Sequence, residues 1–372
     1  MSLLARLTSS DNNHWRLNLN FRKVAPGFPK AVVGYKDQKL VGYGRFSNVY
    51  AALLIERHGY QRYTKKRVAF KKSWPGDNLK DPSEDPEVSA ALVLGQTNAN
   101  VLVASLLHDA MVDHRLSRTL TFDLMACDLR EALLEKTRRS GTRYDHNDGR
   151  LLCYQLLKGC KFLHSKKLLH RDLKPENVMV DPSKLTLKIA DFGWSVAFDG
   201  KALRQVRVGT RQLRAPELLV GNHNYDYGVD VWACGIICVE ILHPCLLIHS
   251  TEHEGILQEW NDLLGPPNAA QVRSFCGSTK VPRSLLPAGW GQEEASAAPT
   301  QRQIQLLAKR LHAVDSDALL MIVRYLCTYS VNKRSLREAA SSAYFAPLRE
   351  ANGKMNDGRP LPYDKSYFST LC

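Results

Sequence analysis

The order of apolar and polar residues predicts strands in the first part of the chain and long helices beyond it. Residues 41–50, VGYGRFSNVY, followed by the run RVAFKK at 67–72, are typical of a strand, a loop and further strand. Apolar residues at helical spacing predict a helix in 86–95 and a longer amphipathic helix in 151–164, LLCYQLLKGCKFLH. Another strand is expected to end at Phe122.

The most apolar stretch, residues 231–248, predicts a buried helix rather than a membrane span. It contains Glu240, His243 and Pro244, which interrupt the apolar run of about 20 residues that a span requires. The N-terminal sequence MSLLARLTSSDNNHW has no long apolar core, so we expect neither a signal peptide nor an anchor there. These features predict an intracellular protein of the cytoplasm or nucleus that is not secreted and does not span a membrane.

Composition narrows the class of protein only partly. A chain of 372 residues that is 44% hydrophobic fits one large two-lobed domain or two ordinary domains. The formal net charge of +14 is typical of a protein with acidic partners such as nucleotide phosphate, and equally of one whose charge only keeps it in solution. Aromatic residues are not interleaved with basic clusters, so nucleic-acid binding is not favoured.

The nine cysteines are scattered, without a paired C-x-x-C framework, as in proteins of a reducing compartment. Cys234 and Cys238 lie four positions apart on one predicted helical face, inside an apolar stretch. Metal binding is one interpretation of this spacing, but thiols buried in a core are the favoured one.

Two short motifs contain groups suited to phosphate chemistry: residues 170–177, HRDLKPEN, and residues 191–193, DFG. Asp172 can accept a hydrogen bond from an attacking hydroxyl, and Lys174 can neutralise charge on a moving phosphoryl group. Asn177 and Asp191 offer the oxygen ligands that Mg²⁺ prefers, so they are the candidate metal ligands.

These motifs, in this order and this close together, resemble those of the eukaryotic protein kinases. The resemblance covers about residues 35–348. It implies an α+β, two-lobed protein kinase fold with a small β-rich N-lobe, which has one main helix, and a larger, mostly α-helical C-lobe. The implied divisions are an N-terminal extension (1–34), an N-lobe (35–122), a hinge (123–128), a C-lobe (129–348) and a C-terminal tail (349–372).

In this resemblance residues 41–50 correspond to the glycine-rich lid over nucleotide phosphates. Gly42 and Gly44 let the backbone approach a phosphate, although a Gly-x-Gly pair alone usually marks a hairpin turn. The third glycine of the family pattern is Ser47 here, which should stiffen the lid slightly. The residues expected to line the nucleotide are Val41, Gly42, Gly44, Ser47, Val49, Ala69, Lys71, Glu87, Phe122, Asp123, Met125, Met179 and Asp191.

Lys71 follows Val-Ala-x and stands where the family keeps the lysine that bridges the α- and β-phosphates. Lys72 is its competitor, and the alternative is that both belong to one solvated basic face. A glutamate on the next helix should hold the lysine. Glu87 is the candidate and Glu84 the alternative, because a helix that starts at Pro86 leaves Glu87 in its first turn.

Residues 120–129, LTFDLMACDL, resemble the kinase hinge, whose backbone N–H and C=O groups would hydrogen-bond adenine. Phe122 would then be the gatekeeper, and Val49, Ala69 and Met179 would sandwich the purine. Ordinary core packing predicts the same residue types at each of these positions.

Further landmarks imply supporting roles in the C-lobe. Thr210 matches the family threonine that hydrogen-bonds near the catalytic aspartate and lysine. Glu217 of the Ala-Pro-Glu motif should pair with Arg334. Asp230, in DVWACG, matches an aspartate that braces the catalytic loop, and the alternative is a helix N-cap. The expected catalytic residues are Asp172, Lys174, Asn177 and Thr210.

Other segments suggest a subgroup. The position of Lys174 two residues after Asp172 follows the serine/threonine pattern. RAPELL at 214–219 and LLGPPN at 263–268 resemble the cyclin-dependent and mitogen-activated kinases, of which the chain looks like a divergent member. The cyclin-binding helix of those relatives reads DPSEDPE here, which does not support a cyclin-like activator as partner.

The relatives also cage an activating phosphothreonine with three arginines, and only Arg171 remains here. The other two positions are Pro86 and Val196. Residues 196–208, VAFDGKALRQVRV, contain no Ser, Thr or Tyr. We therefore expect activity that does not require phosphorylation of this segment.

The resemblance implies Mg²⁺-dependent transfer of the ATP γ-phosphoryl group to serine or threonine of protein substrates, with Asp172 as base. Arg214 suggests a proline after the target residue. Acidic flanks are suggested instead by four basic residues, Lys201, Arg204, Arg207 and Arg211. The competing class is a pseudokinase-like scaffold that binds partner proteins, and the intact catalytic set opposes it.

Overall fold

The computed structural model describes residues 14–16, 32–43, 47–58, 62–74, 84–95, 97–112, 115–141, 144–203, 205–243, 246–292, 299–311, 315–351, 354–355 and 358–369. The chain forms two compact units, Met1–Ala126 and Cys127–Cys372. The division falls inside the segment 123–128 that the sequence predicts as a hinge. The α+β class is confirmed, since a sheet dominates the first unit and helices dominate the second.

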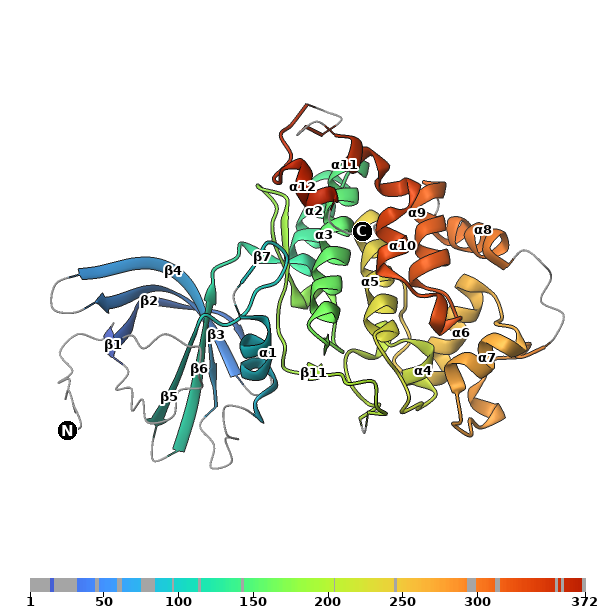
Figure 1. The fold of residues 1–372 in the computed structure, drawn as a ribbon, viewed down its shortest axis with the longest axis horizontal. Coiled ribbons are helices and arrows are strands. Elements are labelled where there is room, and N and C mark those ends of the chain that lie inside the picture. Colours follow the sequence, from blue (N-terminus) through green and yellow to red (C-terminus); the bar gives the residue numbers. More distant parts are fainter. Residues whose placement is uncertain are drawn as a thin grey trace. The chain divides into compact units, whose positions relative to one another are not determined.

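The first unit is built on a six-stranded antiparallel sheet of order β1-β2-β3-β4-β6-β5 (Figure 1). Its strands are β1 (His14–Arg16), β2 (Val32–Tyr43), β3 (Ser47–His58), β4 (Arg62–Ser73), β5 (Leu106–Val112) and β6 (Arg115–Asp123). Apolar side chains that alternate along these strands form the core of this unit: Tyr35, Ala52, Leu54, Val68, Phe70 and Leu106.

The first unit has one described helix, α1 (Pro86–Leu94), and its two ends follow from local residue chemistry. Asp85 caps the N-terminus, Pro86 occupies the first turn, and Gly95 with φ 78° ends the helix. Glu87 therefore lies in the first turn of α1, as the position of Pro86 predicts.

The second unit is organised around two helices that lie side by side, α3 (His146–Ser165) and α5 (Gly228–Leu242) (Figure 1). Asp145 caps α3, which contains the amphipathic helix predicted over 151–164. Nearly all of α5 is buried, as predicted for the stretch 231–248, but the helix ends at Leu242 and not at residue 248. Pro244 accounts for the earlier end, because the residue before a proline is disfavoured in a helix. Trp232 of α5 packs edge-on against Trp260, with ring centroids 4.6 Å apart.

Shorter elements surround this pair. The remaining helices are α2 (Leu129–Ser140), α4 (Pro216–Leu219), α6 (His253–Leu264), α7 (Ala269–Cys276), α8 (Pro299–Leu311), α9 (Ser316–Met321), α10 (Leu336–Ser341), α11 (Ala346–Glu350) and α12 (Lys365–Ser369). Short helical turns lie at Pro175–Asn177, Arg211–Leu213, Arg283–Leu285, Ile322–Leu326, Val331–Lys333 and Ala343–Phe345. The strands are β7 (Cys127–Asp128), β8 (Leu168–Leu169), β9 (Val178–Asp181), β10 (Thr186–Ile189) and β11 (Val196–Ala197).

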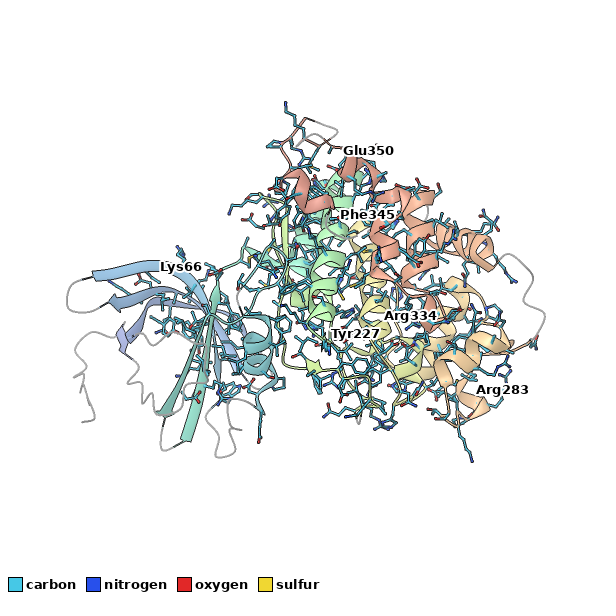
Figure 2. The ribbon with its side chains drawn as sticks, viewed as in Figure 1. Lys66, Tyr227, Arg283, Arg334, Phe345 and Glu350 are labelled. Atoms are coloured by element: carbon cyan, nitrogen blue, oxygen red, sulfur yellow. The ribbon has the colours of Figure 1, made fainter. Side chains whose placement is uncertain are left out.

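Both ends of the chain contribute more structure than the sequence predicts. Strand β1, from the predicted N-terminal extension, pairs with β2. In the predicted tail, Phe368 is buried against Tyr154 of α3, whose hydroxyl donates to the Phe368 carbonyl at 2.8 Å. Tyr154 also contacts Phe345, which Figure 2 labels. These contacts are long-range packing, which local patterns do not report. No helix in the described ranges is long and apolar enough to cross a membrane.

Candidate active site

Five of the predicted nucleotide-binding residues share one face of the sheet in the first unit. Val49 lies opposite Lys71 and Gly42, while Ala69 lies opposite Phe122. Directly opposed residues of antiparallel strands project to the same face, so these five residues line one surface. The opposite face holds the apolar core, where Tyr50 and Phe70 stack with centroids 5.0 Å apart. The register thus brings together five of the residues that the sequence predicts around a purine and its phosphates.

The Lys71 ammonium is held by a carboxylate of α1. Its Nζ donates to Oε2 of Glu87 at 2.8 Å, and the two side chains are 24% and 8% exposed. Lys72 points to the other face because side chains alternate along a strand, and Glu84 is exposed ahead of α1. The ion pair thus joins Lys71 and Glu87, the lysine and the glutamate that the sequence favours.

The other predicted residues of this unit differ in their surroundings. Ser47 is buried, whereas Val41 is 53% exposed on β2. Asp123 ends β6 with its carboxylate paired to Lys66, and Met125 is half-buried just beyond that strand. Gly44 lies outside the described residues.

In the second unit, four donor groups converge on the Asp172 carboxylate. Thr210 donates to Oδ1 through its backbone N–H at 2.8 Å and its hydroxyl at 2.9 Å. Asn177 donates to Oδ2 at 3.1 Å, and the Lys174 ammonium lies 3.6 Å from the same oxygen. Asp172 is only 8% exposed, so this carboxylate is fixed in direction and largely shielded from water. The four predicted catalytic residues therefore form one cluster.

The loop that carries Asp172 is anchored by a buried carboxylate of α5. Asp230 accepts the backbone N–H groups of His170 and Arg171, each at 2.9 Å, and Nε2 of His164 lies 3.0 Å from its Oδ2. Burial would raise the pKa of Asp230, but the hydrogen bond and charge of His164, with the His170 contacts, lower it. The predicted brace is confirmed. The alternative N-cap role is wrong, because α5 begins at Gly228 and Asp230 lies inside its first turn.

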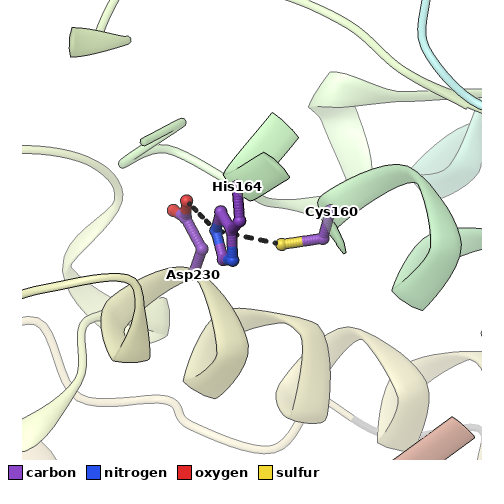
Figure 3. A group of neighbouring side chains, drawn as sticks. All are labelled: Cys160, His164 and Asp230. Carbon is purple, nitrogen blue, oxygen red and sulfur yellow. Dashed lines mark hydrogen bonds and ion pairs between the residues drawn. The ribbon is translucent and has the colours of Figure 1, made fainter. Parts of the chain in front are cut away.

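Cys160 joins His164 and Asp230 in a set of residue types that could hold a metal ion (Figure 3). However, both Asp230 oxygens already accept backbone N–H groups of the catalytic loop. Burial also raises the pKa of the Cys160 thiol well above its usual range, which keeps it protonated. The cluster therefore serves as a brace. Cys234 and Cys238 lie outside this set and are fully buried in α5, as core thiols are.

Two residues next to the catalytic groups have left-handed backbone conformations that rarely suit side chains. Arg171 has φ 66° and Asp191 has φ 59°. Such conformations cost on the order of 1–3 kcal/mol each and require firm support from their surroundings. Phe192 supplies part of that support, since its buried ring lies 5.2 Å from the ring of His170. The sequence also predicts Asp191 and Met179 as nucleotide-binding residues. Asp191 is exposed, and Met179 lies on β9.

Within the described part of the chain, the Arg171 guanidinium donates only to neutral groups. It donates to the carbonyl of Trp194 at 2.8 Å, the hydroxyl of Tyr225 at 3.1 Å and Oε1 of Gln205 at 3.5 Å. Tyr225 in turn donates to the Gln205 carbonyl at 2.6 Å. We call Arg171, Gln205 and Tyr225 the neutral clasp. It ties the segment after DFG to the catalytic loop, and no motif in the sequence indicates it.

Arg214 donates hydrogen bonds to two backbone carbonyls next to Thr210 in the chain. Its Nε donates to Val208 at 2.8 Å, and its NH2 group donates to Gly209 at 2.8 Å. Gly209 has φ 69°, and a β-carbon there would lie 2.2 Å from the carbonyl oxygen of Arg171. A residue with a side chain would therefore not fit at this position.

Glu217 and Arg334 form the predicted buried ion pair. Two nitrogens of the guanidinium contact the two carboxylate oxygens, with NH2 to Oε2 at 3.0 Å. The side chains are 1% and 0% exposed. Arg334, labelled in Figure 2, also donates to the carbonyls of Thr328 and Gly228, so its charge is fully partnered.

Comparison with known proteins gives a consistent result. A family model described as "Protein kinase domain" matches residues 35–345. Cyclin-dependent kinase B2-1 of Oryza sativa subsp. japonica is 30% identical over 316 residues, covering 84% of this chain and 89% of that protein. Mitogen-activated protein kinase 5 of Arabidopsis thaliana is 27% identical over 314 residues, covering 84% and 77%. Serine/threonine kinase NLK of Caenorhabditis briggsae is 33% identical over 197 residues, covering 52% and 28%.

Proposed function

This chain belongs to the protein kinase family, and from that premise we propose that Asp172 and its neighbours transfer the γ-phosphoryl group of ATP to serine and threonine hydroxyls of proteins. Its relatives are cyclin-dependent and mitogen-activated kinases at modest identity, and the chain is a protein serine/threonine kinase of that divergent kind. The observation that carries the proposal is the convergence of Thr210, Asn177 and Lys174 on the Asp172 carboxylate.

In the proposed mechanism Asp172 orients the substrate hydroxyl and accepts its proton as the oxygen attacks the γ-phosphorus of ATP. The bond from that phosphorus to the bridging oxygen breaks, and ADP leaves. Thr210 and Asn177 fix the direction of the carboxylate, so that no reorganisation is needed during transfer. Lys174 screens the negative charge that develops on the phosphoryl group. Such catalysis depends mainly on positioning and electrostatics.

Lys71 would bind the α- and β-phosphates of ATP. Glu87 keeps the lysine extended from the sheet face that also carries Val49, Ala69 and Phe122. A compact ammonium suits this role because it is a point charge with several donors. The purine would lie against the three apolar side chains, with Phe122 as gatekeeper.

Asn177 and Asp191 fit the ligand set of Mg²⁺, a hard cation that prefers oxygen. The amide nitrogen of Asn177 is engaged with Asp172, so its Oδ1 is the atom that would meet a cation. Mg²⁺ would supply charge neutralisation on the triphosphate. The residues of the chain would orient it and place the hydroxyl.

We further propose that the neutral clasp orders the segment after DFG without phosphate. A phosphate normally orders such a segment through charge pairing with arginine. Here neutral oxygens of Trp194, Tyr225 and Gln205 already accept from Arg171. The absence of Ser, Thr and Tyr from residues 196–208 agrees with this.

For substrates, we propose a preference for proline after the target residue. The carbonyls of Val208 and Gly209 already accept from Arg214, so a substrate N–H would compete with the guanidinium for them, whereas proline has no N–H to place. An acidic preference is less supported, because Arg211 is already paired with Glu252 at 3.3 Å. Peptides that differ only in Pro or Ala after the serine test this. A higher kcat/KM for the proline peptide is expected, and equal values would contradict the preference.

The proposed activity is tested by incubating the purified chain with γ-labelled ATP and a mixture of protein substrates, with Mg²⁺ or with excess EDTA. We expect phosphoserine and phosphothreonine only when Mg²⁺ is present. Phosphotyrosine as the main product would contradict the residue preference. No transfer, together with retained binding of a partner protein, would favour the scaffold.

A further inference from the structure

A buried arginine in the first unit connects the sheet to the start of α1. Arg118 of β6 is 2% exposed and lies directly opposite Asp109 of β5. Its Nε and NH2 groups donate to the two oxygens of Asp109, at 2.9 and 3.1 Å. Its NH1 group donates to Oδ2 of Asp85, the N-cap of α1, at 3.1 Å. One guanidinium therefore bridges a strand and a helix.

Asp85 divides its two oxygens between helix and sheet. Oδ1 accepts the backbone N–H groups of Glu87 at 2.9 Å and Val88 at 3.3 Å, and Oδ2 accepts from Arg118. The first turn of α1 is thus fixed to β6 through one side chain. Because Glu87 lies in that turn, the direction of its carboxylate depends directly on this cap.

Arg118 lies on the sheet face that carries Lys71. Leu120 is opposite Lys71, and Arg118 is two positions from Leu120 along β6. Arg118 and Lys71 therefore project to the same side of the sheet. The connected contacts run from Asp109 through Arg118 and Asp85 to the first turn of α1, and from Glu87 to Lys71 at 2.8 Å. We call Arg118 and Asp85 the helix latch.

A buried charge of this kind needs an explanation other than stability. Desolvation offsets much of the attraction in a buried ion pair, which chiefly fixes geometry. A nine-residue helix is also marginal by itself and takes its position from tertiary contacts. Burial tends to lower the pKa of Arg118, but Asp109 and Asp85 raise it, so the guanidinium remains charged and holds both carboxylates.

We propose that Arg118 is a positioning residue for phosphoryl transfer: through Asp85 it holds α1 so that Glu87 engages Lys71, without help from a partner protein. The proposal rests on the proposed kinase activity. It assigns to this chain an internal device that sets the position of α1.

The test compares Arg118→Met with Asp85→Asn in the full chain. Asparagine caps helices about as well as aspartate, so Asp85→Asn retains the cap but removes the charge that faces Arg118. Arg67→Met is the matched control, because Arg67 is an exposed basic residue of the same sheet. We expect both latch variants to lower kcat/KM for ATP by about 10- to 100-fold, as small misplacements of catalytic groups do. The control should match the wild type.

A double-mutant cycle separates positioning from general loss of structure. In a Glu87→Gln background, Arg118→Met should cause no further loss, because the latch acts through Glu87. An undiminished effect of Arg118→Met in that background would overturn the proposal, as would wild-type kinetics in both latch variants.

Hydrogen exchange provides a readout that does not need activity. Amides of residues 87–94 should exchange faster in both latch variants, while those of β2 and β3 should not change. If the wild type transfers no phosphate, the proposed activity fails, and this exchange comparison alone decides the latch. Unchanged exchange in residues 87–94 of both variants would overturn the proposed role of the helix latch.

Discussion

Asp172 and Thr210 are joined twice, since the backbone N–H and the hydroxyl of Thr210 both donate to Oδ1 of Asp172, at 2.8 and 2.9 Å. The two residues are 38 positions apart, so this contact connects the catalytic loop to the segment that precedes Ala-Pro-Glu. Thr210 thus holds Oδ1 of the proposed base, while Asn177 and Lys174 contact Oδ2.

Replacing Thr210 by valine removes the hydroxyl but retains the backbone donor. A hydrogen bond to a charged group contributes about 1.5–3 kcal/mol, so we expect kcat to fall about 10- to 100-fold. Thr210→Ser retains the hydroxyl and should stay close to the wild type. Steady-state kinetics of the two variants provide the measurement. Equal kcat values for valine and serine would show that the hydroxyl does not position Asp172.

Removing Glu217 should destabilise the second unit strongly. Glu217→Ala leaves the Arg334 guanidinium buried without its carboxylate, which costs about 3–5 kcal/mol. The double variant Glu217→Leu/Arg334→Met removes both charges and should recover much of the loss. Urea unfolding followed by tryptophan fluorescence compares the three proteins. A double variant less stable than Glu217→Ala would contradict the assignment.

The neutral clasp predicts activity without phosphate on the segment after DFG. Phosphatase treatment of the wild type should leave kcat unchanged. Tyr225→Phe removes the hydroxyl that joins Arg171 to Gln205, so kcat should fall about 10-fold. Tyr227→Phe, two residues further along, is the control and should have little effect. Loss of activity after phosphatase treatment, with phosphate mapped to residues 196–208, would show that the neutral clasp does not replace a phosphate.

Cys127 should react slowly with alkylating reagents despite partial exposure. Burial, followed by the charges of Glu131, Asp128 and Asp181, raises the pKa of its thiol to about 11. Only the thiolate reacts, so labelling at pH 8 should be roughly 100-fold slower than for an ordinary cysteine. The rate should rise with pH until about 11. Mass spectrometry of the peptide that contains Cys127 measures it, and Glu131→Gln should speed it. A labelling rate that levels off near pH 8 would contradict the raised pKa of the Cys127 thiol.

Contiguous motifs were predictable because one short segment holds the reacting groups. Asp172, Lys174 and Asn177 lie within six positions, and the structure clusters them. Alternation along β4 also separates Lys71 from Lys72 once the strand is known. The sequence left open whether Asp230 braces a loop or caps a helix, because that depends on where α5 begins.

The remaining contacts join residues that are far apart in the chain. Arg118 and Asp85 are 33 positions apart, and Arg171 and Tyr225 are 54 apart. From sequence alone, an arginine in a strand is expected to be exposed, because its charge is buried only when carboxylates from other parts of the chain pair with it. The packing of Phe368 on Tyr154 could not be predicted either, because the two residues are 214 positions apart in the chain.

The central claim is that Asp172 acts as the base, and the Asp172→Asn variant tests it most directly. Asparagine has nearly the same shape but cannot take a proton, and general-base catalysis typically contributes about 10²–10⁴-fold. We predict that kcat falls by about that factor while the Kd for Mg·ATP stays within about twofold of the wild-type value. Phosphate incorporation by Asp172→Asn at the wild-type rate would contradict the account.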